Sequence, residues 1–186
     1  SKVGLTLSRD TRDSILFPKE GSIMSLKKEF AGGIFGGDAE YGRLELQGAR
    51  FIQTFDPMEQ VLSVSGRTGT IGRFNGEEAN VPFFERFFLG GRDVRGFDSN
   101  GLGPRDTGSG GAVGGNNIYS GTVEIVSNLG VTKDAGLRWT VFSDFGSVWA
   151  TDFPSGVTKP DEQAMRSSLG FGILWNTVIG PLSFYW

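Results

Sequence analysis

Neither cysteine nor histidine occurs among the 186 residues of this sequence. The absence of cysteine excludes a disulfide framework and a thiolate nucleophile. The absence of histidine removes the commonest general base and the commonest zinc ligand, and it makes a Ser-His-Asp triad impossible. Carboxylate or hydroxyl chemistry remains open, but we expect a protein that is not an enzyme and that needs neither a metal nor another cofactor.

Long apolar runs and an excess of positive charge are also absent. No window approaches the ~20 apolar residues that a membrane-spanning helix needs. The 18 basic and 21 acidic residues give a net charge of −3, without the basic stripe of a nucleic-acid binder, so we expect no nucleic-acid partner. The first residues carry neither an initiator methionine nor the apolar core of a signal peptide, which predicts a processed chain or a fragment.

Glycine and aromatic residues are abundant instead. Glycine accounts for 30 of the 186 residues, more than twice its usual share of about 7%. The 16 phenylalanines and 4 tryptophans, together with the small net charge, are not the composition of a disordered chain.

The apolar residues recur with a period of two, which is typical of β-strands. Tyr119, Val123 and Ile125 share one face of such a segment, for example, and Thr122 and Glu124 share the other. The pattern predicts an all-β, antiparallel fold of about eight strands, near residues 3–7, 24–30, 44–47, 62–67, 119–125, 137–144, 166–175 and 182–186. After Gly48 the parity drifts toward Phe51, which predicts a bulge or a strand end there.

This alternation fits two kinds of barrel. In a soluble, lipocalin-like barrel the apolar face points inward, whereas in an outer-membrane barrel it faces lipid and the polar face lines the lumen. Three features favour the transmembrane β-barrel: small residues mixed with charges on the polar faces, large aromatics near strand ends, and tight turns that alternate with long polar connections. The soluble barrel remains the alternative.

The connection at about 75–117 is too long for an ordinary loop. It begins with an apolar cluster that should pack against other parts of the protein rather than extend into water, through Phe83, Phe84, Phe87 and Phe88. A glycine-rich stretch follows. We expect a loop that folds back into the barrel lumen.

One arginine of this loop, Arg95, has two candidate partners on the predicted wall. Glu124 and Asp144 fall on the polar faces of two neighbouring strands, which lie ~4.8 Å apart, so both carboxylates could reach one guanidinium. The alternative is that Arg95 is solvated and that Asp144 opens a turn before Gly146.

Several motifs together closely resemble the BamA-type family of bacterial outer-membrane β-barrel assembly factors. The most specific is the loop motif Val94-Arg95-Gly96-Phe97, preceded by the aromatic segment 82–87 and by Gly90-Gly91. Further matches are the segments 13–18, 114–116, 122–124, 142–149 and 180–182, so that the resemblance extends over essentially the whole chain.

The resemblance implies a fold. Residues 1–186 would form the C-terminal portion of an outer-membrane β-barrel, about half of a 16-stranded barrel, and would end before its terminal strand. The loop with residues 94–97 would lie in the lumen, with Arg95 paired to Glu124 and Asp144 on the barrel wall. The remaining strands of the same barrel would then be partners of this chain.

The resemblance also implies a function. Family members fold and insert other β-barrel proteins into the bacterial outer membrane, without a nucleotide or a catalytic residue. The expected partners are the lipid bilayer of the outer membrane, nascent outer-membrane proteins and accessory lipoproteins of an assembly complex. Two alternatives remain open: a two-partner-secretion or TamA-like translocation barrel, and a small autonomous barrel that acts as a pore or an adhesive module.

Overall fold

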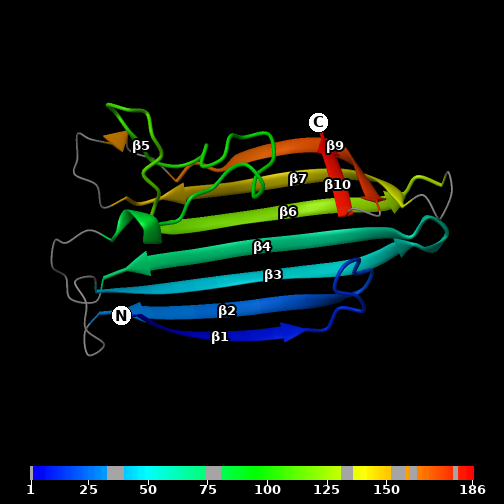
Figure 1. Ribbon diagram of the computed structural model, residues 1–186, viewed down its shortest axis with the longest axis horizontal. Helices are drawn as coiled ribbons and strands as arrows, with labels where there is room; N and C mark the ends of the chain where they lie inside the picture. The colour runs from blue at the N-terminus through cyan, green and yellow to red at the C-terminus, as the bar shows by residue number, and fades with distance from the viewer. Residues whose placement is uncertain are drawn as a thin grey trace.

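The alternating segments form the strands of one antiparallel sheet. A computed structural model describes residues 2–32, 40–73, 81–130, 136–151, 158–159, 163–177 and 180–186. Eight strands follow one another in the order β1-β2-β3-β4-β6-β7-β9-β10 (Figure 1). Their bounds are β1 Lys2–Asp10, β2 Gly21–Ala31, β3 Tyr41–Phe55, β4 Gln60–Gly72, β6 Asn117–Asn128, β7 Leu137–Trp149, β9 Arg166–Thr177 and β10 Gly180–Tyr185.

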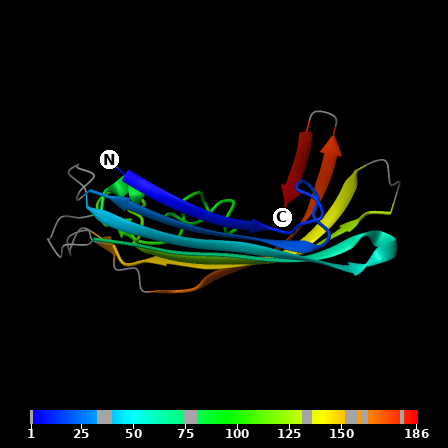
Figure 2. The same ribbon diagram turned by 90° about the horizontal axis from the view of Figure 1, so that it is seen from below.

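The prediction of about eight antiparallel strands is confirmed, and each expected segment overlaps one strand. The sheet is curved, with β1 and β10 at its two edges, so the barrel is not closed in this chain (Figure 2). A small barrel that closes on these eight strands is therefore not what the chain forms.

The predicted irregularity near Phe51 is misplaced. Phe51 is paired regularly with Gly21 on β2 and with Ser63 on β4, and the register shift lies further on, between Gln53 and Phe55. The apolar parity drifts because Phe51 points to the concave side, where it lines a cavity.

The two faces of the sheet differ in chemistry. Large apolar side chains stand exposed on the convex face of the sheet, and neighbouring ones form short rows across adjacent strands, such as Leu7, Leu26 and Leu46. Most of the polar residues of the same strands point to the concave face, one end of which the long loop covers. This is the arrangement of an outer-membrane barrel, with apolar residues outward and polar residues toward the lumen.

The buried core lies between the loop and one end of the sheet, rather than inside a sandwich (Figure 2). Its residues come from the loop and from the loop-side ends of the strands: Ala31, Tyr41, Ile71, Val81, Phe87, Leu89, Val94, Leu102, Ile118 and Val148. The concave face is thus where the chain makes its buried contacts.

Short elements organise the connections. A 3-10 turn, η2 (Asp56–Met58), joins β3 to β4, and η3 (Phe83–Glu85) lies near the start of the described part of the long loop. Two strands of two residues, β5 (Arg105–Asp106) in the loop and β8 (Thr158–Lys159), pair with each other. The sequence pattern did not predict β5 or β8.

Among the residues that the structure describes, no helix has the length and apolarity to cross a membrane.

Candidate functional site

The loop between β4 and β6 lies along the concave face of the sheet (Figure 2). Its described part, residues 81–116, is folded on itself by antiparallel bridges between Phe87 and Gly115 and between Leu89 and Leu102. Residues 75–80, which belong to the predicted loop, lie outside the described residues. The loop is therefore a folded unit whose position is set by the wall beneath it.

Arg95 makes the most extensive polar contact between loop and wall. Its Nε and Nη2 donate to the two carboxylate oxygens of Asp144, at 2.7 and 2.8 Å, in a bidentate arrangement. The backbone N–H of Arg95 also donates to Asp144, at 3.0 Å. Nη1 donates to Oε1 of Glu124 at 3.0 Å. The structure thus brings together the three residues that strand parity and the family resemblance indicated.

Two threonines on the wall orient the carboxylates. Thr122 donates to Asp144 at 2.9 Å, and Thr140 donates to Glu124 at 2.7 Å. The Asp144 side chain is completely buried, and that of Arg95 is only 15% exposed. Charged groups so far from water are retained when they are paired and hydrogen-bonded, as these are.

Aromatic rings enclose the guanidinium of Arg95. The ring centroid of Phe142 lies 3.4 Å from its Cζ atom and that of Tyr185 lies 4.9 Å away. The two rings meet edge to face, with centroids 5.5 Å apart. Gly170 makes room for Phe142, since a Cβ at that position would collide with its ring. These ring contacts add a cation–π attraction to the ion pairs.

The neighbours of Arg95 in the motif hold the backbone in place. Val94 is fully buried in the core, and Phe97 packs against the same core. Gly96 adopts a φ of +87°, a left-handed conformation that glycine reaches at little cost. The motif therefore consists of two apolar anchors, one cation and one backbone turn.

Phe87 provides a second attachment point. It is 1% exposed, and the guanidinium carbons of Arg43 and Arg67 lie 4.4 and 5.7 Å from its ring centroid. Gly69 on β4 leaves the space that the ring fills, because a Cβ there would be 2.6 Å from Cζ of Phe87. Sequence reasoning predicted that Phe87 packs, but not on which residues.

The expectation that all four phenylalanines pack is wrong for Phe84, which is 80% exposed, and largely wrong for Phe83, which is 51% exposed. Phe83 meets Phe88 edge to face at 5.3 Å, and Phe88 is half-buried. Phe83 and Phe84 lie on the short turn η3, none of whose residues is buried, whereas Phe87 follows the turn and is buried.

Acidic residues of the loop pair with basic residues of the wall, which the sequence analysis missed. Glu85 contacts Lys2 at 3.3 Å and Arg43 at 3.9 Å, and Asp93 contacts Arg67 at 3.8 Å. Arg43 and Arg67 fall on the polar faces of their alternating segments, so the alternation could have indicated that both face the loop. The direction of pairing is opposite to that of Arg95, where the loop supplies the cation.

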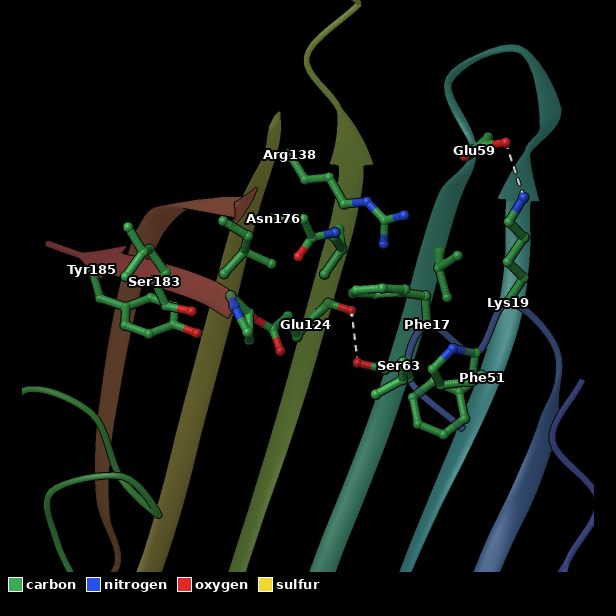
Figure 3. A pocket seen from close by; sticks show the side chains of 17 residues that line it. Phe17, Lys19, Phe51, Glu59, Ser63, Glu124, Arg138, Asn176, Ser183 and Tyr185 are labelled. Atoms are coloured by element: carbon green, nitrogen blue, oxygen red, sulfur yellow. Dashed lines mark hydrogen bonds and ion pairs between the residues drawn. The ribbon is translucent and has the colours of Figure 1, made fainter. Parts of the chain in front are cut away.

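A cavity of about 300 Å³ lies beside Glu124, at the end of the sheet away from the loop (Figure 3). The turn between β1 and β2 reaches over it: Lys19 donates to Glu59 at 2.9 Å, and the Phe17 ring lies 4.7 Å from the guanidinium carbon of Arg138. Among the described residues, no group of three or more acidic side chains is arranged to hold a metal ion.

Comparisons with known proteins agree with this architecture. The family model described as the Omp85 superfamily domain matches residues 1–186. The chain is 32% identical over 182 residues to the outer membrane protein assembly factor BamA of Neorickettsia risticii, covering 98% of this chain and 24% of that protein. It is 30% identical over 178 residues to the BamA of Nitratidesulfovibrio vulgaris, covering 95% of this chain and 21% of that protein.

A SAM50-like protein and a solved BamA structure are also similar to this chain. A SAM50-like protein of Schizosaccharomyces pombe is 34% identical over 103 residues, which cover 54% of this chain and 21% of that protein. The crystal structure of BamA from Haemophilus ducreyi lacking POTRA domains 1–3 shares the fold, with a TM-score of 0.84 and 24% identity over all of this chain and 38% of that one. The chain thus spans a fifth to a quarter of the curated relatives' length.

Proposed function

This chain belongs to the Omp85 superfamily, and we propose that it forms the C-terminal part of the barrel of a factor that folds and inserts β-barrel proteins into the bacterial outer membrane. The observation that carries the proposal is the identity of 32% and 30% to two BamA proteins along nearly the whole chain. The similarity to a SAM50-like protein supports the assembly branch of the superfamily over the translocation branch.

Assembly by such a barrel needs no nucleotide and no catalytic residue. An unpaired strand that enters lipid leaves backbone N–H and C=O groups unsatisfied, at several kcal/mol for each group. A barrel that offers strand pairing and a lipid-facing surface lowers this cost for an incoming chain, and the folding of that chain supplies the free energy. The substrates of this proposal are nascent outer-membrane proteins, and accessory lipoproteins would complete the complex.

The concave site would serve this function by fixing the loop. Arg95, Glu124 and Asp144 join the loop to two adjacent strands, so the loop keeps the lumen side of the wall ordered while strand edges elsewhere exchange partners. The role that we propose for Arg95 is that of a clamp between loop and wall, which stabilises the barrel and has no part in a chemical step.

Depletion of the protein that contains this chain tests the proposal. We expect the folded amounts of many unrelated outer-membrane β-barrel proteins to fall together, and re-expression of the intact protein to restore them. Loss of a single secreted protein, with the other barrels at normal levels, would instead indicate a dedicated two-partner-secretion or TamA-like transporter and would contradict the assembly function.

A second experiment tests the role of Arg95 as a clamp. Cells that carry Arg95→Ala in the full-length protein should accumulate less folded outer-membrane protein, and the variant barrel should lose heat resistance. Arg105→Ala serves as the control, because Arg105 lies in the same loop and, among the described residues, its side chain donates only to the backbone oxygens of Gly101 and Gly110. Wild-type heat resistance and normal outer-membrane protein levels in the Arg95 variant would refute the clamp.

A further inference from the structure

Charges are distributed unevenly between the two faces of the sheet. Register and alternation place three charged residues of the eight described strands on the convex, apolar face, and all three are cations: Arg9, Lys28 and Arg50. The acidic residues of these strands all point to the concave side: Asp10, Glu29, Glu45, Glu124 and Asp144. A convex face without a carboxylate attracts anions.

Two of these cations lie close together. Arg9 on β1 is paired with Met24 on β2, and Met24 is paired with Gly48 on β3. Arg50 lies on β3 two residues after Gly48, toward the turns, where it is paired with Ser22. A separation of two strands and two residues places the two Cα atoms about 12 Å apart. Two arginine side chains can span that distance to meet one ligand, because the residues between them on this face are small or flexible.

Both arginines are exposed, and within the described parts of the chain neither makes an ion pair or a side-chain hydrogen bond. Other arginines of this chain have partners, as Arg12 has in Asp10 at 2.6 Å and Arg67 has in Glu45 at 2.7 Å. Arg9 and Arg50 therefore present guanidinium groups whose hydrogen-bond donors remain available to a ligand.

Their level along the strands indicates where that ligand lies. Arg9 is the penultimate residue of β1, and Arg50 is level with the start of β2, so both flank the turn that joins these strands. Outer-membrane barrels have their short turns on the periplasmic side. At this level an outward arginine reaches lipid head groups, while its aliphatic stem stays against the apolar surface.

The surface next to the arginines suits acyl chains. A shallow groove of about 290 Å³ runs over Met24, Gly48 and Gly66, and Leu46 forms part of its wall. The row above it, toward the membrane interior, is apolar on β1, β2 and β3. An acidic protein would find no complementary polar surface here, whereas a lipid presents a phosphate to the arginines and a hydrocarbon chain to the groove.

We propose that Arg9 and Arg50 together bind the head-group phosphate of an anionic phospholipid in the periplasmic leaflet, with its acyl chains along the groove at Met24 and Gly48. The planar guanidinium matches phosphate oxygens bidentately. This site lies on the opposite face of the sheet from the Arg95 contacts, and it holds whether or not the protein assembles other barrels.

Native mass spectrometry of the full-length protein tests the site by titration with phosphatidylglycerol and, separately, with phosphatidylcholine. Each basic residue at a membrane surface contributes about 1 kcal/mol, or roughly fivefold in affinity, toward anionic lipid. We expect Arg9→Gln and Arg50→Gln each to weaken phosphatidylglycerol binding by roughly fivefold and the double variant by roughly 25-fold. Phosphatidylcholine carries the same phosphate with its charge balanced by choline, so its binding should weaken by clearly less than that of phosphatidylglycerol.

Three controls keep the result interpretable. The double substitution to lysine should retain most of the affinity, and Arg105→Gln, with the same charge change in the loop, should shift it by less than twofold. Heat-modifiable migration of every variant on gels reports that the barrel is folded. Inorganic phosphate at equal concentration should not displace the lipid.

Several outcomes would overturn the proposal. Wild-type affinity in the double glutamine variant would show that the arginines do not bind the lipid. An equal loss for both lipids would show that the arginines contact the phosphate that both head groups carry and do not select an anionic lipid, and an equal loss in Arg105→Gln would leave only net charge. Displacement by inorganic phosphate would mean an anion site without lipid specificity.

Discussion

Asp144→Asn is the sharpest perturbation of the loop-to-wall contact, because it removes one charge and almost no volume. Asp144 accepts four hydrogen bonds, three from Arg95 and one from Thr122, and its side chain is fully buried. The variant leaves the guanidinium of Arg95 with a single carboxylate and places an amide NH₂ against one of its donors.

The magnitude follows from burial. Removal of one partner from a buried ion pair costs about 3–5 kcal/mol. Glu124 still faces Arg95 in the variant, so we expect about 3 kcal/mol, at the lower end of that range. Glu124→Gln is the matched variant: Glu124 accepts one hydrogen bond from Arg95 and is 20% exposed. We expect about 1 kcal/mol for its loss.

Urea titration of the full-length barrel measures both variants. The folded fraction is read from the mobility of unheated samples on gels, and the midpoints are compared with that of the wild type. The expected order of stability is wild type, then Glu124→Gln, then Asp144→Asn. A midpoint for Asp144→Asn at or above that of Glu124→Gln would refute the reasoning, because it would mean that Arg95 does not depend mainly on Asp144.

Three further predictions concern packing and pH. Phe87→Ala should destabilise the barrel by about 3–5 kcal/mol in the same titration, because the ring is buried, whereas Phe84→Ala should change stability by less than about 0.5 kcal/mol. Gly69→Ala should destabilise the barrel by about 1–3 kcal/mol, since its Cβ would collide with the Phe87 ring. Gly66→Ala should be nearly neutral, because its Cβ would make only an ordinary contact. Equal effects of the two variants would contradict the packing of Phe87 against Gly69. The hydrogen bond from Lys19, and to a lesser extent that from Asn128, holds the pKa of Glu59 below its ordinary value. The ionised Glu59 therefore stabilises the turn between β1 and β2 at a pH above its unfolded pKa. This stability is lost as pH falls through the lower folded pKa. Hydrogen exchange of that turn, corrected for intrinsic rates, should therefore accelerate below about pH 4, and by less in Glu59→Gln; an unchanged rate would contradict this.

Much of the fold could be predicted because β-alternation is a local property. Every strand of the large sheet was indicated by its own residues, since a period of two assigns each side chain to a face without knowledge of its partner strand. The same parity placed Glu124 and Asp144 on one face of adjacent strands. The misplaced irregularity at Phe51 shows the limit of the method: an inward aromatic residue produces the same pattern as a bulge.

The family resemblance supplied what parity could not. Alternation placed Glu124 and Asp144 where they could reach Arg95, but it left open that Arg95 is solvated, because the loop itself has no period. The match of the motif and its flanks to a known family indicated that the loop returns to the wall, and the structure places Arg95 on Asp144 and Glu124.

What the sequence by itself determined, then, is the strand content, the two chemically distinct faces and the residues available for contact on each. The tertiary structure decided which of those residues meet. Phe87 lies on Gly69 and between two arginines, Phe84 faces away, and Asp93 pairs with Arg67. The physical reason is that a side chain's face is set by its immediate neighbours in the chain, whereas the path of a long loop is set by contacts between residues far apart in sequence.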